Sequence, residues 1–290
     1  MATKYHVRSN SFPSESHPNS IRIQQHLNKI KTWEATSTST SDSIITSLSF
    51  LEDLYISLED LLNMSSTQKA ISDHQGEKFV EELLDGSIRI LDICSITRDT
   101  MLQIKENVEA LHSSIRRRKG DSSIETSVYE YNLFTKKIKK NVTKLITSLK
   151  QMESKFGASQ VLSEDKEVVD VIRVIREIIV VNMSIFQSLL TFLTGSKSKS
   201  NKWLKVAKLV NSKKVSSSSS CEENLNELKC VEECLRTLLR EGSNNVEKMK
   251  DANEKLESLE NVIEMIENGL ENVFRRLVKT RVCFLNIMTQ

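Results

Sequence analysis

Proline and glycine are both scarce in this sequence. The 290 residues include two prolines, Pro13 and Pro18, so the chain after Pro18 lacks the residue that most strongly breaks a helix. Only seven glycines are present, which leaves few positions for the tight hairpin turns of β-structure. These two shortages argue against a β-rich or α/β fold and predict helix along almost the whole chain. With aromatics at 5%, the core is expected to be aliphatic.

The chain also lacks an excess of charge of either sign. Lys and Arg number 41 against 39 Asp and Glu, a net charge of +2. Nucleic-acid-binding domains are usually strongly basic, so we expect no nucleic-acid partner. The five cysteines are scattered, and residues 1–20 contain no apolar stretch typical of a signal peptide. We therefore expect a cytoplasmic protein with reduced thiols, not a secreted one.

Apolar residues recur at alternating steps of three and four, which is typical of helices packed in a bundle. One such series is Ile44, Leu48, Leu51, Tyr55, Leu58 and Leu62, and the longest runs from Met249 to Ile287. Short breaks at 119–123 and 157–163 favour antiparallel neighbours. The predicted fold is all-α: an elongated antiparallel helical bundle with long heptad-patterned helices, a disordered N-terminal arm and a Lys/Ser-rich loop.

The domain organisation follows from the same patterns. Residues 1–19 are polar and predict a disordered arm, and residues 20–290 predict one helical-bundle domain interrupted by a flexible Lys/Ser-rich loop at 195–220. Ser20 is the expected cap of the first helix. The 163–194 helix is apolar on more than one face, which indicates a central, buried helix. Its most apolar part, 178–193, is shorter than the roughly 20 residues of a membrane span.

The arm carries the most specific short motif. Arg8, Ser9, Ser11 and Pro13 form the pattern R-S-x-S-x-P. Phosphorylation of Ser11 would add charge and three acceptor oxygens, which suit the basic groove of a 14-3-3 type adaptor. An unmodified, solvated arm is the alternative.

The 195–220 stretch is basic and contains no acidic residue. Its candidate binding residues are Lys197, Lys199, Lys202, Trp203, Lys205, Lys208, Lys213 and Lys214. A tryptophan at the front of a basic amphipathic segment suits an anionic membrane surface or a calmodulin-like partner. A solvated linker is the alternative. A second lysine cluster, Lys136–Lys140, is interpreted as the solvent-exposed face of a bundle helix.

Motifs of catalysis are missing from the sequence. There is no glycine-rich phosphate loop, no G-x-S-x-G and no H-E-x-x-H. Carboxylates are expected on the outer faces of the helices, paired with lysines. Cys230 and Cys234 lie one helical turn apart, but a tetrahedral zinc site needs four ligands, so we expect them to pack as apolar residues. The sequence therefore predicts a protein without enzymatic activity, cofactor or metal.

Five segments in order along the chain together resemble the plant BYPASS-like family. They are HVRSNSFPSESHP (6–18), LEDLYISLEDLL (51–62), ELLDGSIRILDICSITRD (82–99), IRRRKG (115–120) and GLENVFRRLVKTRVCFLNIMTQ (269–290). The resemblance implies a plant helical protein, some of whose relatives are linked to root and shoot development, and it brings no catalytic residues. We expect a non-enzymatic interaction or regulatory protein of plant development. Self-association as a homo-oligomer stays open, because heptads serve dimers and intramolecular bundles equally well.

Overall fold

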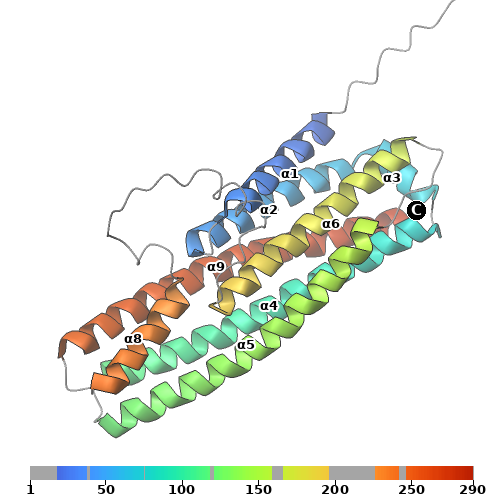
Figure 1. Cartoon of the computed structure of the whole chain (residues 1–290). Coiled ribbons are helices and arrows are strands. Elements are labelled where there is room, and N and C mark those ends of the chain that lie inside the picture. The colour runs from blue at the N-terminus through green and yellow to red at the C-terminus, as the bar shows by residue number, and fades with distance from the viewer. Residues whose placement is uncertain are drawn as a thin grey trace, which may run out of the picture.

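The protein is an elongated bundle of α-helices (Figure 1). The structure, a computed structural model, describes residues 18–37, 40–74, 76–117, 121–158, 166–195, 226–241 and 246–289. Within these residues the helices are α1 Pro18–Thr36, α2 Ser41–Leu62, α3 Ser65–Ser72, α4 Lys78–Arg116, α5 Asp121–Ala158, α6 Lys166–Leu193, α8 Glu227–Glu241 and α9 Val246–Met288. The all-α bundle is therefore confirmed. The predicted disordered arm and flexible loop lie almost entirely outside the described residues.

The helix ends agree with the sequence pattern to within a few residues. The long helix expected from 76 to 118 is α4, and the apolar helix expected from 163 to 194 is α6. Helix α1 begins at Pro18, two residues before the expected cap at Ser20. Proline suits the first position of a helix because its φ angle is already helical and its missing N–H has no partner to lose there.

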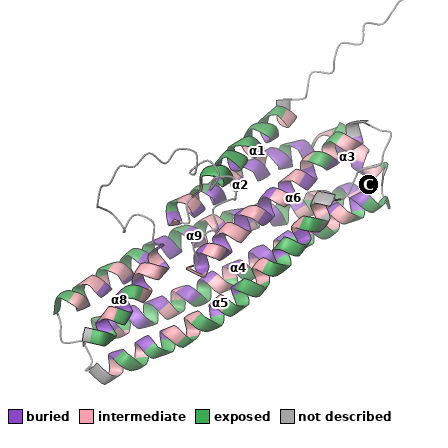
Figure 2. Cartoon of the chain, viewed as in Figure 1, coloured by how far each residue is buried: buried purple, intermediate pink, exposed green. Residues whose placement is uncertain are grey.

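The heptad residues form the core. Every member of the series from Ile44 to Leu62 is buried, and so is every member of the series from Met249 to Ile287. Figure 2 shows these buried residues facing the inside of the bundle and the exposed ones along its outer edges. Because the core side chains are aliphatic and interdigitate along the full length of 38- to 43-residue helices, the bundle is long and narrow.

Most helices that follow one another in the chain run antiparallel, but α6 and α8 run in the same direction, and so do some pairs that are distant in the chain (Figure 1). Leu48 of α2 lies against Gly269 of α9, and Glu59, further along α2, pairs with Arg276, further along α9. A Cβ atom at Gly269 would lie 3.2 Å from the Cβ of Leu48, so only glycine allows the two helices to approach this closely. The sequence did not reveal which helices pair in parallel.

Helix α6 lies at the centre, in contact with α1, α2, α3, α4 and α5. Its buried residues point in several directions, among them Ile172, Ile179, Phe186 and Leu190. The prediction of a central buried helix is confirmed. None of the helices in the described part of the chain is long and apolar enough to cross a membrane.

Candidate functional site

The candidate residues in the two linear segments lie outside the described residues. These are Arg8, Ser9, Ser11 and Pro13 of the arm, and Lys197, Lys199, Lys202, Trp203, Lys205, Lys208, Lys213 and Lys214 of the basic segment. The points where the basic segment leaves and rejoins the bundle are described, however. They are Gly195, after α6, and Asn226, before α8. We call the side chains around these two residues the segment base.

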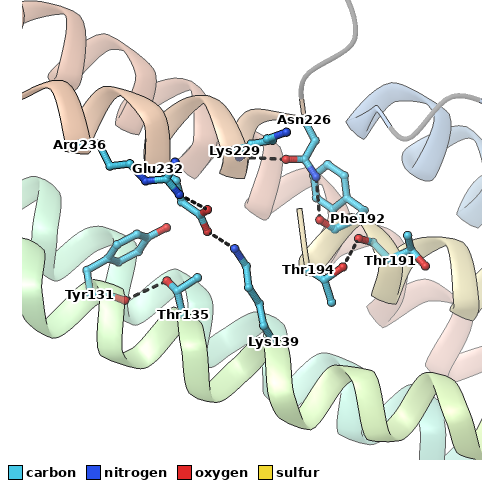
Figure 3. Close-up of polar contacts among 10 residues, drawn as sticks. All are labelled: Tyr131, Thr135, Lys139, Thr191, Phe192, Thr194, Asn226, Lys229, Glu232 and Arg236. Atoms are coloured by element: carbon cyan, nitrogen blue, oxygen red, sulfur yellow. Dashed lines mark hydrogen bonds and ion pairs between the residues drawn. The ribbon is translucent and has the colours of Figure 1, made fainter. Parts of the chain in front are cut away.

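Asn226 joins α6 to α8 with both ends of its amide (Figure 3). Its Nδ2 donates to the carbonyl oxygen of Phe192 at 2.8 Å, and its Oδ1 accepts from the backbone N–H of Lys229 at 2.9 Å. The second bond caps the start of α8, where the Lys229 N–H also donates to the backbone carbonyl of Asn226 at 3.0 Å. Because Asn226 is only 5% exposed, water cannot easily replace these two bonds.

Gly195 ends α6 at the same place. Its φ of +64° lies in the left-handed region, where a helix commonly stops and where glycine meets no steric penalty. Its N–H donates to Phe192 O at 3.0 Å, so this carbonyl accepts from Gly195 and from Asn226. Gly195, at the start of the basic segment, and Asn226, six residues after its end, are thus tied to one carbonyl group.

Helix α5 lies below the segment base in Figure 3 and contacts it through Lys139. Lys139 of α5 pairs with Glu232 of α8 at 2.5 Å, and Glu232 is largely buried. Tyr131, about two helical turns before Lys139, is buried beside this pair. Burial, and to a lesser extent the negative charge of Glu232, raises the pKa of Tyr131 to about 12. Tyr131 therefore stays neutral near pH 7 and adds no charge beside this pair.

The segment base also lies close to the Lys136–Lys140 cluster of α5. A Cβ atom at Gly195 would lie 3.9 Å from Nζ of Lys139 and 4.0 Å from Cβ of Lys229. The basic segment therefore leaves and rejoins the bundle beside two lysines. The Lys136–Lys140 cluster is confirmed as an exposed face for Lys136, Lys137 and Lys140, whereas Lys139 turns inward to Glu232.

A second group of buried charges contradicts the expectation that carboxylates lie on outer faces. Glu59 of α2 is only 5% exposed and accepts from Nζ of Lys279 at 2.6 Å and from Nη1 of Arg276 at 3.2 Å. The prediction is wrong for Glu59 because α9 covers the side of α2 that a single amphipathic helix would leave to solvent. Arg176 of α6 is likewise buried and pairs with Glu82 of α4 at 2.8 Å.

The α4–α9 pair carries a shallow depression of about 300 Å³. It is lined by Arg98, Asp99, Leu102, Glu267, Asn268, Leu270 and Glu271. The arginine that lines this depression makes contacts within the bundle. Arg98 pairs with Glu271 and lies 4.3 Å above the ring of Phe274. Lys105 and His112 extend the same row of contacts to Glu267 and Glu260, each at 2.8 Å. These side chains hold two antiparallel helices together.

Cysteines and potential metal ligands are dispersed. Among the described residues no three His, Cys, Asp or Glu side chains converge on a point that could hold a metal ion. Cys234 is buried and donates to Asp251 of α9 at 3.3 Å, while Cys230 is half-buried. Cys234 therefore contributes to the α8–α9 contact, as expected of a packed cysteine.

The segment base was missed by sequence reasoning, although a signal was present. Asn226 stands directly before Glu227 and a helical apolar series, which is a typical helix start. That Asn226 would also reach Phe192 could not be read from the sequence, because this bond joins residues that are 34 positions apart.

Comparison with known proteins agrees with the resemblance noted in the sequence. The model of the family described as Protein BPS1 matches residues 47–287, which include every helix from α3 to α8 and most of α2 and α9. No curated protein and no solved structure matches the chain. Since the match covers well over half of the sequence, the chain belongs to the BPS1 family, the BYPASS-like family of plants.

Proposed function

We propose that the chain is a non-catalytic interaction protein that regulates plant development by presenting two linear segments on a stiff helical bundle. Family membership supports the role in development. The mode of action is supported by how the bundle uses its polar side chains.

The observation that carries this proposal is that buried acidic and basic side chains form ion pairs between helices. Glu59 joins α2 to α9, Arg176 joins α6 to α4, and Glu232 joins α8 to α5. Catalytic acids and bases, by contrast, usually face a cleft with a proton-transfer partner left to the substrate. A bundle braced in this way is suited to hold recognition segments at fixed places.

The first recognition segment is the arm with the motif from Arg8 to Pro13. A phosphate on Ser11 would form charge-assisted hydrogen bonds with the arginines and lysines of a 14-3-3 type adaptor. Because the arm precedes α1, such docking need not disturb the core.

Pull-down from plant extract tests this docking. The full chain, phosphorylated by that extract, is expected to retain 14-3-3 type adaptors, and Ser11→Ala should abolish the retention. Ser14→Ala removes a nearby serine outside the motif and serves as the matched control. Equal recovery of adaptors with Ser11→Ala and the unsubstituted chain would refute the docking.

A second candidate function is attachment to an anionic membrane surface through the basic segment. The observation in its favour is the segment base, where Gly195 and Asn226 are tied to the same carbonyl of Phe192. Both ends of the lysine-rich segment therefore leave from one point of the bundle, and its charges are expected to act on the same surface.

Vesicle flotation tests the attachment. We expect binding to phosphatidylcholine vesicles only when they contain phosphatidylserine, and weaker binding at high salt. Replacing the seven lysines of the basic segment by glutamine should lower the binding strongly. Binding that is equal on neutral and anionic vesicles would contradict an electrostatic attachment.

A further inference from the structure

Helix α5 carries an outer face whose lysines have no partner in the bundle. Between Tyr131 and Met152 the helix contains six lysines and no acidic residue. One of them, Lys139, pairs with Glu232, whereas Lys136, Lys137, Lys140 and Lys144 are exposed, and none of these four forms an ion pair within the described part of the chain. Elsewhere in the bundle, lysines and arginines commonly bridge helices.

The four lysines lie on one side of the helix. Their spacing of three or four residues continues from Tyr129 and Leu133, which are 63% and 48% exposed. The series from Tyr129 to Lys144 extends over about 22 Å at 1.5 Å per residue. Helix α5 forms an outer edge of the bundle, and Figure 2 shows exposed residues along the side that faces away from α4 and α6. We call Tyr129, Leu133, Lys136, Lys137, Lys140 and Lys144 the α5 face.

The chemistry of the α5 face favours a diffuse negative charge over a single carboxylate or phosphate. Helix α5 contains no arginine, the side chain suited to bidentate recognition of one anionic group. Arginine is used elsewhere in the bundle for specific contacts, as in the pair of Arg176 with Glu82. Lysine has a long flexible stem and a compact charge, so a row of lysines can follow a surface that has no fixed pattern. The exposed Tyr129 and Leu133 suit the boundary between lipid headgroups and acyl chains.

The position of the α5 face relative to the segment base agrees with this partner. Lys139, which lies against Gly195, is the immediate neighbour of Lys140 in the α5 face. The basic segment, with seven more lysines, therefore leaves and rejoins the bundle at the border of the α5 face. Because Gly195 and Asn226 lie beside Lys139, the two lysine-rich elements can act together on one extended anionic surface.

We infer that the α5 face is a docking surface for an anionic lipid bilayer, on which the helix lies with its lysines toward the headgroups and Tyr129 and Leu133 at one end. This inference rests on the anionic membrane of the second candidate function, not on its basic segment, and adds a folded contact to the linear one. A free acidic protein is the competing partner.

Flotation of the full chain with charge-matched variants tests the inference. The α5-face variant replaces Lys136, Lys137, Lys140 and Lys144 by glutamine. The control variant makes the same change at Lys29, Lys69, Lys78 and Lys250, which are exposed on α1, α3, α4 and α9. Each lysine near an anionic surface contributes about a fivefold factor in binding, so the α5-face variant should lose about a hundredfold or more on phosphatidylserine-containing vesicles. The control variant should bind like the unsubstituted chain.

Two further variants separate charge from shape. Arginine at the same four positions should keep vesicle binding, because the charge is retained. Tyr129→Ser with Leu133→Ser should weaken binding by a factor that stays the same at high salt, because the lost contact is apolar. Unchanged helical circular dichroism and unfolding midpoint in each variant show that the bundle is intact.

The outcomes distinguish this inference from the attachment through the basic segment. Equal binding of the α5-face variant and the control variant overturns the inference, even if the segment variant binds poorly. Loss in the α5-face variant together with full binding of the segment variant upholds the inference and refutes the segment. The unsubstituted chain could instead bind polyglutamate but not anionic vesicles. If the α5-face variant then also loses the binding to polyglutamate, the partner is an acidic protein and the lipid assignment is wrong.

Discussion

Replacing Asn226 by alanine probes the segment base directly. The substitution removes two hydrogen bonds at once, the one to the Phe192 carbonyl at 2.8 Å and the one from the Lys229 N–H at 2.9 Å. It leaves the backbone bonds from Lys229 and Cys230 to the carbonyl of residue 226 in place. We therefore expect α8 to form, but to be held less firmly to α6.

The magnitude follows from the two bonds taken separately. Loss of a helix cap costs about 1 kcal/mol. Loss of the bond to Phe192 costs about 1 kcal/mol more, since this carbonyl still accepts from the N–H of Gly195 and is not left without a partner. The free energy of unfolding should fall by about 2 kcal/mol in Asn226→Ala. In Asn226→Ser the hydroxyl can still act as a cap acceptor and only the bond to Phe192 is lost, so a fall of about 1 kcal/mol is expected.

Denaturant titration gives the free energies, and amide hydrogen exchange locates the effect. The N–H groups of Lys229 and Cys230 should exchange faster in Asn226→Ala, whereas those in the middle of α4 and α9 should change only with global stability. A loss below about 0.5 kcal/mol in Asn226→Ala, or an equal loss in the alanine and serine variants, would refute the two-bond account of Asn226.

Two other predictions concern the rest of the bundle. Glu59→Gln should lower the free energy of unfolding by about 1 to 3 kcal/mol in a denaturant titration, which is less than for a fully enclosed pair because Lys279 is 60% exposed. Asp60→Asn serves as the control. It breaks an exposed pair with Arg22 and should cost less than about 1 kcal/mol. Cys94 is fully buried, and burial raises the pKa of its thiol to about 12. The raised pKa keeps the thiol protonated, so alkylation of Cys94 should be far slower in the native protein than in denaturant. Mass spectrometry from pH 7 to 9 measures the two rates. Equal rates of labelling would contradict the place of Cys94 in the core.

Much of the fold could be predicted because each helix carries its own periodicity. The series from Ile44 to Leu62 and from Met249 to Ile287 are buried as expected, since a step of three or four residues returns a side chain to the same face whatever the neighbour is. Close packing at Gly86, by contrast, depends on a residue of another helix. A Cβ atom at Gly86 would lie 2.6 Å from Cζ of Phe156 in α5.

The contacts between helices could not be predicted in the same way. Glu59 stands between Leu58 and Asp60 in an ordinary amphipathic pattern, and nothing local distinguishes it from the exposed Asp60. Its burial depends on α9, more than 200 residues later in the chain, which brings Arg276 and Lys279 to it. A parallel pairing such as that of α2 with α9 needs a long connection, and heptads alone do not specify it.

Charge shows most clearly why position matters more than composition for the function of this chain. The net charge of +2 gave no reason to expect an anionic partner, because it sums over both signs wherever they lie. In the folded protein, acidic residues of α9 are partly neutralised by cations of α4, as in the pair of Lys105 with Glu267. The acid-free part of α5 lies on an outer edge, and among the described residues no acidic side chain pairs with Lys136, Lys137 or Lys140. A nearly neutral chain therefore presents a locally basic surface, and this surface adjoins the point where its most basic segment leaves the bundle.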